Sequence, residues 1–423
     1  MVKENIQRGE IKMIQFDASE TQGAKIKVVG VGGAGGNAIN GMIEAGLQGV
    51  EFVVINTDAQ DLEKSQASMR VQIGKNLTKG LGAGSNPEIG LRAIMEDKER
   101  VIEIINGADM VFVTCGLGGG TGTGAAPIVA EIARDLGALT VAVVTMPFTF
   151  EGPFRRRNAE KGLEALRERV DTIIAIQNDR LFSIIERNTT VVAAFKAVDS
   201  ILLEATRSIS DLINVHGYIN LDFADIKTIM QGMGDALMGT GVGIGENRAI
   251  TAAEQAITSP LLDGVDISGA RGVLINITGG PTMSMHEVGE ASTVIQEAVG
   301  NEANVIFGMV IDENLNEELR VTVIATGFNK ELQQAEILHK PKEEIKIEQE
   351  EEVPEQIEEI VDETRESTDF KEYDKPAFKR KSQKRKGELL NMAQPNFFFL
   401  GDDDLENDPE NLEIPAFLRK QMD

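Results

Sequence analysis

The sequence has few of the residues that build disulfide frameworks and metal centres. It contains one cysteine, Cys115, and three widely spaced histidines, His216, His286 and His339, among 423 residues. A single thiol excludes a disulfide framework and a multi-thiolate metal site. We therefore expect no metal ion held by the chain's own side chains, and we interpret Cys115 as a small buried residue at the end of a strand.

Long apolar runs and an excess of basic residues are also missing. The longer apolar runs, Met110–Cys115 and Thr140–Thr145, have the length of a strand rather than the ~20 residues of a membrane helix. A net charge of −26 disfavours duplex nucleic acid and direct adhesion to an anionic membrane. Residues 1–22 hold no apolar segment typical of a secretory signal. We expect a cytoplasmic protein with no nucleic-acid partner and no direct membrane insertion.

Up to Phe328 the chain is expected to contain an N-terminal extension and three folded parts. Residues 1–24 are polar and are predicted to form a disordered extension. Residues 25–190 alternate short apolar runs with helical stretches, which is typical of an α/β fold with a Rossmann-like parallel sheet. Residues 191–215 keep apolar spacing near 3.6 over six turns, which predicts one long central helix. Residues 216–328 then form a smaller α+β unit.

The same patterns predict the individual elements. Strands are expected over residues 25–29, 52–55, 110–114, 140–144, 172–176, 272–277, 305–311 and 319–324. Helices are expected from the glycines that follow residue 29 through Ala45 and over residues 89–105, 125–136, 155–169, 191–215, 225–230, 248–257 and 283–299.

The composition changes after Phe328. Residues 329–423 hold about 26 acidic and 15 basic side chains, and this balance predicts a disordered linker over 329–410. A short recognition peptide is expected over 411–423. The linker contains a basic patch, Lys375–Lys386, and an apolar cluster, Phe397–Leu400, to which we assign no role.

The first glycine-rich stretch lies between a predicted strand and a predicted helix. It reads Gly30-Val-Gly32-Gly33-Ala34-Gly35-Gly36-Asn37 and matches the G-x-G-x-x-G pattern. Glycine lets a backbone approach a phosphate closely, and a helix N-terminus offers free N–H groups. The motif alone is weak, because a tight turn would also use it. Asp58 follows the second strand, where a dinucleotide fold keeps its ribose-binding acid, so a nicotinamide-binding fold stays open at this point.

The second glycine-rich stretch is far more specific. Gly116–Gly124 holds six glycines among nine residues, where a structural turn needs one or two. Its threonines add hydroxyls that reach phosphate oxygens or the water shell of Mg²⁺. A dehydrogenase needs only one such loop, and no G-x-x-x-x-G-K-[ST] motif occurs in the chain. The pattern indicates a phosphate-binding site of another class.

Gly118–Gly124, read as Gly-Gly-Gly-Thr-Gly-Thr-Gly, is the signature of the tubulin superfamily. The region from Lys25 to Phe328 resembles the FtsZ family of bacterial cell-division GTPases. Further segments that carry this resemblance occur in order: Asn56–Ala59, Gly82–Pro87, Phe150–Gly152, Gln177–Asp179, Asn220–Asp225, Ala270–Val273, Arg320–Gly327 and the terminal Ile414–Gln421.

The resemblance implies that GTP or GDP is the cofactor, with Mg²⁺ held through phosphate and water. Glu151 and Arg155 match the family's ribose-contacting pair, although spacing alone also fits an i,i+4 surface pair. Asn178 and Asp199 match the guanine-reading residues, and Phe195 matches a base-stacking position. The implied nucleotide-binding set is Gly32, Gly33, Ala34, Gly35, Gly36, Asn37, Gly118, Gly119, Gly120, Thr121, Gly122, Thr123, Gly124, Glu151, Arg155, Asn178, Phe195 and Asp199.

The resemblance also implies that three polar residues act on the nucleotide of a neighbouring subunit. Asn220, Asp222 and Asp225 match the segment that positions water for attack on the γ-phosphate. On the sequence alone, Asp222 is equally well interpreted as a helix N-cap with Asp225 at N3, and both interpretations can hold at once. A site shared between opposite faces is heterologous and predicts head-to-tail filaments.

The C-terminal peptide is expected to bind a membrane-tethering adaptor and other division proteins. Ile414, Pro415, Phe417, Leu418 and Arg419 form its apolar anchor and basic rim. We therefore expect filaments at the division site on the inner face of the cell membrane. Two alternatives stay open, namely a dinucleotide-dependent oxidoreductase and a nucleotide-regulated scaffold that does not hydrolyse GTP.

Overall fold

A computed structural model describes residues 23–328, with the exception of 184, 187, 215–220, 263–266, 301 and 314. The expected N-terminal extension, the linker and the C-terminal peptide therefore lie outside the described residues, as does Asn220. The chain divides into two units, 1–343 and 344–423, and all the described residues belong to the first.

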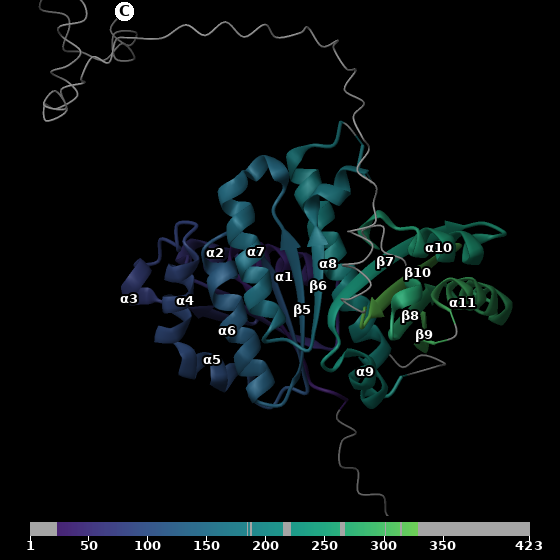
Figure 1. Ribbon diagram of the computed structural model, residues 1–423, viewed down its shortest axis with the longest axis horizontal. Helices are drawn as coiled ribbons and strands as arrows, with labels where there is room; N and C mark the ends of the chain where they lie inside the picture. Colours follow the sequence, from purple (N-terminus) through teal and green to yellow (C-terminus); the bar gives the residue numbers. More distant parts are fainter. Residues whose placement is uncertain are drawn as a thin grey trace, which may run out of the picture. The chain divides into compact units, whose positions relative to one another are not determined.

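The described residues form one ten-stranded sheet with the order β3-β2-β1-β4-β5-β6-β7-β10-β8-β9 (Figure 1). The strands are β1 Ile26–Val31, β2 Val50–Asn56, β3 Met69–Gln72, β4 Met110–Gly116, β5 Leu139–Met146, β6 Thr172–Gln177, β7 Gly234–Ile244, β8 Gly272–Gly279, β9 Asn304–Ile311 and β10 Glu318–Thr326. Adjacent strands pair in parallel except at β10, which is antiparallel to β7 and β8. The predicted parallel α/β sheet is confirmed.

Eleven α-helices accompany this sheet in the described part of the chain. They are α1 Gly32–Glu44, α2 Ala59–Lys64, α3 Lys75–Thr78, α4 Pro87–Glu96, α5 Lys98–Ile105, α6 Thr121–Asp135, α7 Pro153–Arg167, α8 Val191–Asn214, α9 Phe223–Met230, α10 Arg248–Ile257 and α11 Met285–Val299. Short 3-10 helices cover Thr149–Glu151, Asn178–Ser183, Pro260–Leu262 and Ile267–Gly269.

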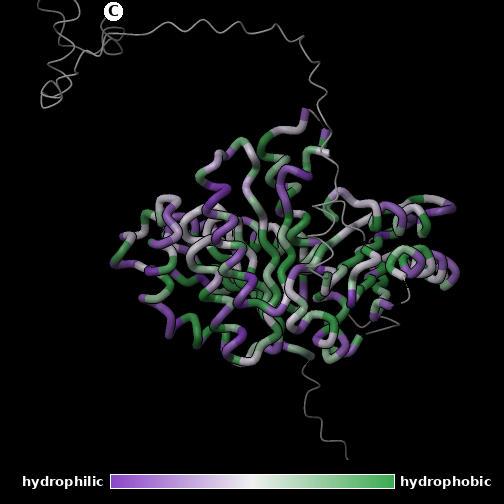
Figure 2. The backbone as a smooth tube through the Cα atoms, viewed as in Figure 1, coloured by the Kyte–Doolittle hydropathy of each residue, from purple (hydrophilic) through white to green (hydrophobic). Residues whose placement is uncertain are grey.

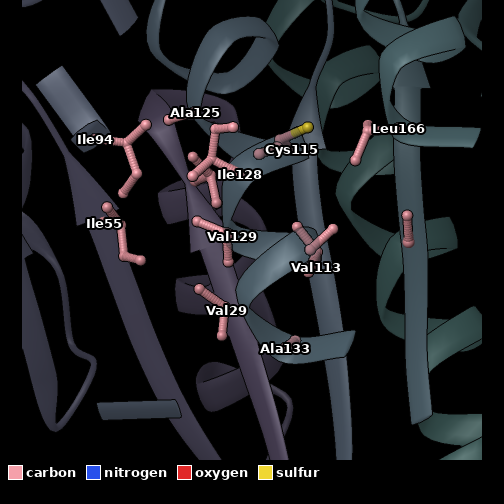
Figure 3. Close-up of a cluster of buried hydrophobic side chains, with 14 of the residues drawn as sticks. Val29, Ile55, Ile94, Val113, Cys115, Ala125, Ile128, Val129, Ala133 and Leu166 are labelled. Carbon is pink, nitrogen blue, oxygen red and sulfur yellow. The ribbon is translucent and has the colours of Figure 1, made fainter. Parts of the chain in front are cut away.

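Helices cover both faces of the parallel half of the sheet. On one face, α4, α5, α6 and α7 bury apolar side chains against β1, β2 and β4; Figure 3 shows Val129 of α6 lying among Val29, Val113 and Ile55. On the other face α1, α8 and α9 pack against the same strands and against β5 and β6. In Figure 2 the strands are mostly hydrophobic, whereas the surrounding helices alternate in colour. This explains the near-continuous apolar runs, because parallel strands are buried on both faces.

The second half of the sheet carries its own core. Helices α10 and α11 pack against β7, β8 and β10 and bury a separate apolar cluster. Strand β7 nevertheless pairs with β6 over Thr172–Ile174 and Gly234–Ala236, so the smaller unit extends the same sheet. Helix α8 contacts β5, β8 and β9 and so joins the two halves.

Several predicted boundaries differ from the structure for local reasons. The helix expected over 89–105 is two helices, because Asp97 adopts a non-helical conformation and its carboxylate accepts a hydrogen bond from the backbone N–H of Gly74. Helix α6 begins at Thr121 rather than Ala125, so it contains the last glycines of the second loop. Cys115 is fully buried in β4, as predicted, and burial raises the pKa of its thiol to about 12.

Candidate functional site

A cleft of about 580 Å³ lies at the carboxyl ends of the parallel strands. Residues that follow β1, β2, β4, β5 and β6 line it, which is where open α/β sheets place ligands. Thirteen of the predicted nucleotide-binding residues line this cleft: Gly32, Gly33, Ala34, Asn37, Gly119, Gly120, Thr121, Gly122, Glu151, Arg155, Asn178, Phe195 and Asp199.

The two glycine-rich stretches meet at the base of the cleft. Gly32 has a φ of +74°, which side-chain-bearing residues rarely adopt, and a Cβ on it would lie 2.9 Å from the backbone nitrogen of Gly122. Each stretch continues into a helix, α1 or α6, whose first N–H groups have no partner within the helix. The chain thus brings two helix N-termini together without side chains between them, which suits a phosphate-bearing ligand.

The other predicted glycines of these stretches serve packing rather than the cleft lining. A Cβ on Gly124 would lie 1.9 Å from the carbonyl oxygen of Pro87, so this glycine lets α4 contact α6. A Cβ on Gly35 would lie 2.6 Å from the carbonyl oxygen of Thr114 in β4. Gly36, Gly118 and Thr123 also lie outside the cleft lining; the Thr123 hydroxyl accepts a hydrogen bond from the Gly118 N–H at 2.9 Å.

Two polar side chains that line the cleft, Asn178 after β6 and Asp199 on α8, are partly or fully withdrawn from water. Asn178 is 5% exposed, and its Oδ1 has no hydrogen-bond partner in the described structure. Asp199 projects from α8, and burial raises the pKa of its carboxyl to about 6. A buried acceptor and a desolvated carboxylate both require donors. Guanine offers such donors at N1–H and N2–H.

An aromatic cluster holds the predicted stacking residue beside these groups. Phe148 is buried, and the ring of Phe195 meets it edge-on with centroids 5.6 Å apart. Phe150 stacks on Phe148 at 5.0 Å, and Phe182 contacts it at 5.3 Å. Phe195 itself remains 43% exposed and lines the cleft, so it offers apolar surface to a planar ligand.

Glu151 and Arg155 form an ion pair, and both residues line the cleft. The Arg155 Nη1 atom lies 2.6 Å from Glu151 Oε2, in the i,i+4 relation that the surface-pair interpretation predicted. The second carboxylate oxygen of Glu151 accepts a hydrogen bond from the Phe148 N–H at 2.9 Å. This contact anchors the pair to the aromatic cluster.

The predicted catalytic acids lie far from the cleft within one chain. Asp222 caps α9, its carboxylate accepting from the Ala224 N–H, and Asp225 lies in the first turn, so the helix-cap interpretation is confirmed. The last residue of α9, Met230, accepts a hydrogen bond from the hydroxyl of Thr172, the first residue of β6. Helix α9 therefore packs at the amino end of β6 (Figure 1). The cleft lies at the carboxyl end of this strand, where Asn178 lines it. Both acids are exposed.

The predicted nucleotide-binding set leaves out several residues that line the cleft, and Asp58 was predicted only as the ribose-binding acid of a dinucleotide fold. Asn56 is the last residue of β2 and Asp58 follows this strand, while residues 81–85 also line the cleft. The Asp58 carboxylate caps α2 by accepting from the N–H groups of Gln60 and Asp61, a local role that differs from a ribose-binding acid. Their position directly after a buried parallel strand is the signal that points to the cleft.

Comparisons with known proteins place the chain in a family. Residues 25–186 match the model of the Tubulin/FtsZ family GTPase domain, and residues 234–329 match that of the FtsZ family C-terminal domain. A structure of an empty FtsZ dimer from M. jannaschii is 47% identical and has a TM-score of 0.69, covering 72% of this chain and 88% of that chain. A mutant FtsZ from the same organism is also 47% identical, with a TM-score of 0.70, over 72% and 92% of the two chains.

A more distant structure supports the fold alone. A GTPγS-bound protofilament of CetZ2 from Haloferax volcanii is 22% identical with a TM-score of 0.63, over 72% of this chain and 94% of that one. Together, the matching domains and the 47% identity show that the chain belongs to the FtsZ family within the tubulin superfamily. This is a family of GTP-binding cytoskeletal GTPases, so membership replaces the oxidoreductase hypothesis.

Proposed function

We propose that this chain is a GTPase that assembles head to tail into filaments forming the ring at the cell-division site. The observation that carries the proposal is the separation of two half-sites on one sheet. The glycine-lined cleft lies at the carboxyl ends of the strands, and the exposed acids of α9 lie toward the amino end of β6. A second subunit that offers its α9 to the cleft would complete the site.

The cleft residues take distinct roles in this proposal. The N–H groups that open α1 and α6 hold the phosphates, and Asn178 and Asp199 accept hydrogen bonds from guanine. Phe195 stacks on the base, while Glu151 and Arg155 contact the ribose. The unpartnered Oδ1 of Asn178 supports guanine over adenine, because adenine presents no N1–H donor.

Hydrolysis in this proposal needs residues from both subunits. Asp222 and Asp225 of the incoming subunit, with Asn220, accept hydrogen bonds from a water and orient it in line with the γ-phosphate. The N–H groups of α6 stabilise the charge that gathers on the phosphate oxygens. Mg²⁺ would neutralise part of that charge, held by phosphate oxygens and by water that the Thr121 hydroxyl and the Asp61 carboxylate contact.

Filament growth follows from the symmetry of such a contact. A cleft on one face that receives an acidic cap from the opposite face of the next subunit is heterologous, and such contacts form open filaments when the rotation does not close. Bound GTP favours this junction, and its hydrolysis loosens it. Phosphate release per subunit is therefore expected to rise with protein concentration, whereas an isolated subunit that is complete by itself would give a flat dependence.

Mixed filaments test the shared site directly. Asp199→Ala removes a base contact but keeps the acids, and Asp222→Ala keeps the cleft but loses an acid. Each variant alone is expected to be inactive. An equimolar mixture recovers about a quarter of the wild-type rate, since about one junction in four then joins an intact cleft to intact acids. Light scattering confirms co-assembly, and a co-assembled but inactive mixture contradicts the shared site.

The tail provides the proposed route to the membrane. No helix among the described residues is long and apolar enough to cross a bilayer. We propose that Ile414, Pro415, Phe417, Leu418 and Arg419 bind an adaptor and other division proteins at the inner face of the membrane. Removing residues 411–423 is expected to leave GTP hydrolysis unchanged and to abolish recruitment to the division site in cells. Loss of GTP hydrolysis in the shortened chain would contradict the proposal that the tail serves recruitment and not hydrolysis.

A further inference from the structure

A buried pair of hydroxyl groups connects β2 to the second glycine-rich stretch. The Oγ1 atoms of Thr57 and Thr121 lie 2.7 Å apart, although the two residues are 64 positions apart in the sequence. Thr57 is fully buried, and Thr121 is 8% exposed. Two hydroxyls at this distance share one hydrogen bond, and either of them can be the donor.

The two threonines differ in their access to the cleft. Thr121 lines the cleft and is the first residue of α6, whereas Thr57 does not line it. Asn56 and Asp58, on either side of Thr57, do line the cleft, so the backbone places the Thr57 side chain behind the wall. Thr57 can therefore affect a bound ligand only through Thr121.

The backbone fixes Thr57 in this position. Its carbonyl oxygen lies 3.3 Å from the Thr78 hydroxyl, whose single proton it shares with the carbonyl oxygen of Gly74 at 3.1 Å. All these groups lie in buried surroundings. The backbone at Thr57 is thus held by contacts within the fold, and its buried hydroxyl contacts Thr121.

The direction of the shared hydrogen bond decides what Thr121 can offer to a ligand. A phosphate oxygen carries no proton and only accepts hydrogen bonds. If Thr121 donates to Thr57, only lone pairs face the cleft and they repel the phosphate. If Thr57 donates to Thr121, the Thr121 proton is free to point into the cleft. An anionic ligand selects this second direction, and chains of hydrogen bonds strengthen one another.

We propose that Thr57 is a positioning residue for phosphate binding. Its hydroxyl donates to Thr121, and Thr121 in turn donates to a phosphate oxygen of the nucleotide. This inference rests on the proposed function, because it requires that a nucleotide phosphate occupies the cleft beside Thr121. It adds to that function a residue that never touches the ligand.

Nucleotide affinity in the full-length protein tests the role of Thr57. Calorimetric titration with GTP is expected to give a dissociation constant about tenfold weaker for Thr57→Val than for the wild type, because Thr121 loses the hydrogen bond that orients its proton toward the phosphate and strengthens that contact. Thr57→Ser keeps the hydroxyl and should stay within about twofold of the wild type. Guanosine, which has no phosphate, should bind all three proteins equally. An unchanged GTP affinity in Thr57→Val, or an equal loss for guanosine, overturns the proposal.

A double-mutant cycle tests whether Thr57 acts through Thr121. In a Thr121→Val background, Thr57→Val is expected to weaken GTP binding by less than about twofold, since the relay is already broken. A full tenfold effect in that background would refute the relay. If Thr57→Val fails to fold, Thr57→Cys keeps the side-chain size with a much weaker donor and should show an intermediate loss. Failure of the wild type to bind GTP would instead contradict the proposed function itself.

Discussion

The two edges of the parallel sheet, where its strands end and where they begin, carry different side chains. At the carboxyl edge, glycines let two helix N-termini approach each other beside a cleft that polar side chains line. At the amino edge, helix α9 presents exposed carboxylates whose local role is a helix cap. The acids at the first edge, Asp61 and Asp199 among them, line the cleft, whereas the exposed Asp222 and Asp225 at the second edge do not. In the proposed function, these two edges are the two halves of a site that a second copy completes.

The largest expected effect comes from separating hydrolysis from binding at the amino edge. Asp222→Ala should lower the rate of GTP hydrolysis at least about 100-fold, because a group that orients the attacking water is lost. The affinity of GTP for the subunit should not change, since Asp222 lies outside the cleft. Phosphate release and calorimetry measure the two quantities.

Glu254→Ala is the matched control for this variant, because Glu254 is an exposed acid on α10. It should hydrolyse GTP at the wild-type rate. A weakened affinity for GTP in Asp222→Ala would show that the two edges are not separate, and the comparison would fail.

Two glycines of the second glycine-rich stretch provide the next test, because replacing one by alanine should weaken GTP binding and replacing the other should lower stability. A Cβ on Gly119 meets nothing within 4 Å, so Gly119→Ala should fold normally and weaken GTP binding by about tenfold or more through contact with the phosphates. A Cβ on Gly124 would lie 1.9 Å from the Pro87 carbonyl oxygen, so Gly124→Ala should lower the free energy of unfolding by about 2 kcal/mol or more. Thermal unfolding and nucleotide titration separate them. Equal effects on stability would contradict the assignment.

The glycine loops also show how far the sequence can be interpreted. Gly116–Gly124 predicted a phosphate-binding site, because a structural turn between a strand and a helix needs only one or two glycines and this stretch holds six. Pattern alone could not distinguish Gly119, which faces the cleft, from Gly124, which faces α4. That difference depends on the contact between Gly124 and Pro87, which lie 37 positions apart. The residues next to each glycine in the sequence therefore cannot predict it. Strand β7 was not predicted for a related reason, since its glycines at 239, 241 and 243 accommodate α10 and break the apolar pattern.

The cleft acid predicts a dependence of GTP affinity on pH. Burial raises the pKa of Asp199 to about 6 in the empty cleft, and guanine N–H groups favour the charged carboxylate. The protonated form cannot accept both hydrogen bonds, so binding should weaken as the pH falls below about 6. The affinity at pH 5 is expected to be about tenfold lower than at pH 7. Titration calorimetry across this range measures it.

The control must separate Asp199 from a second acid on the same helix. Asp211 also has a pKa raised to about 6 by burial, but it lines a different cavity. Asp199→Asn removes the titrating group in the cleft and leaves Asp211, so its GTP affinity should be weaker and should keep only the part of the pH dependence that comes from the γ-phosphate of GTP, whose second pKa is about 6. A pH dependence as large as that of the wild type in this variant would assign the effect elsewhere.

The smallest expected effect concerns the region between the two edges, where contacts should stabilise the fold without reaching the nucleotide. Glu204 of α8 bonds Arg320 of β10 at 3.0 Å, and both side chains are only partly exposed. Glu204→Gln should lower the free energy of unfolding by about 1 kcal/mol and leave GTP affinity unchanged. Glu160→Gln breaks an exposed pair with Arg156 and should cost about 0.3 kcal/mol or less. Chemical denaturation resolves the difference. A changed GTP affinity in Glu204→Gln would mean that α8 transmits strain to the cleft, and the two edges would then be energetically coupled within one subunit.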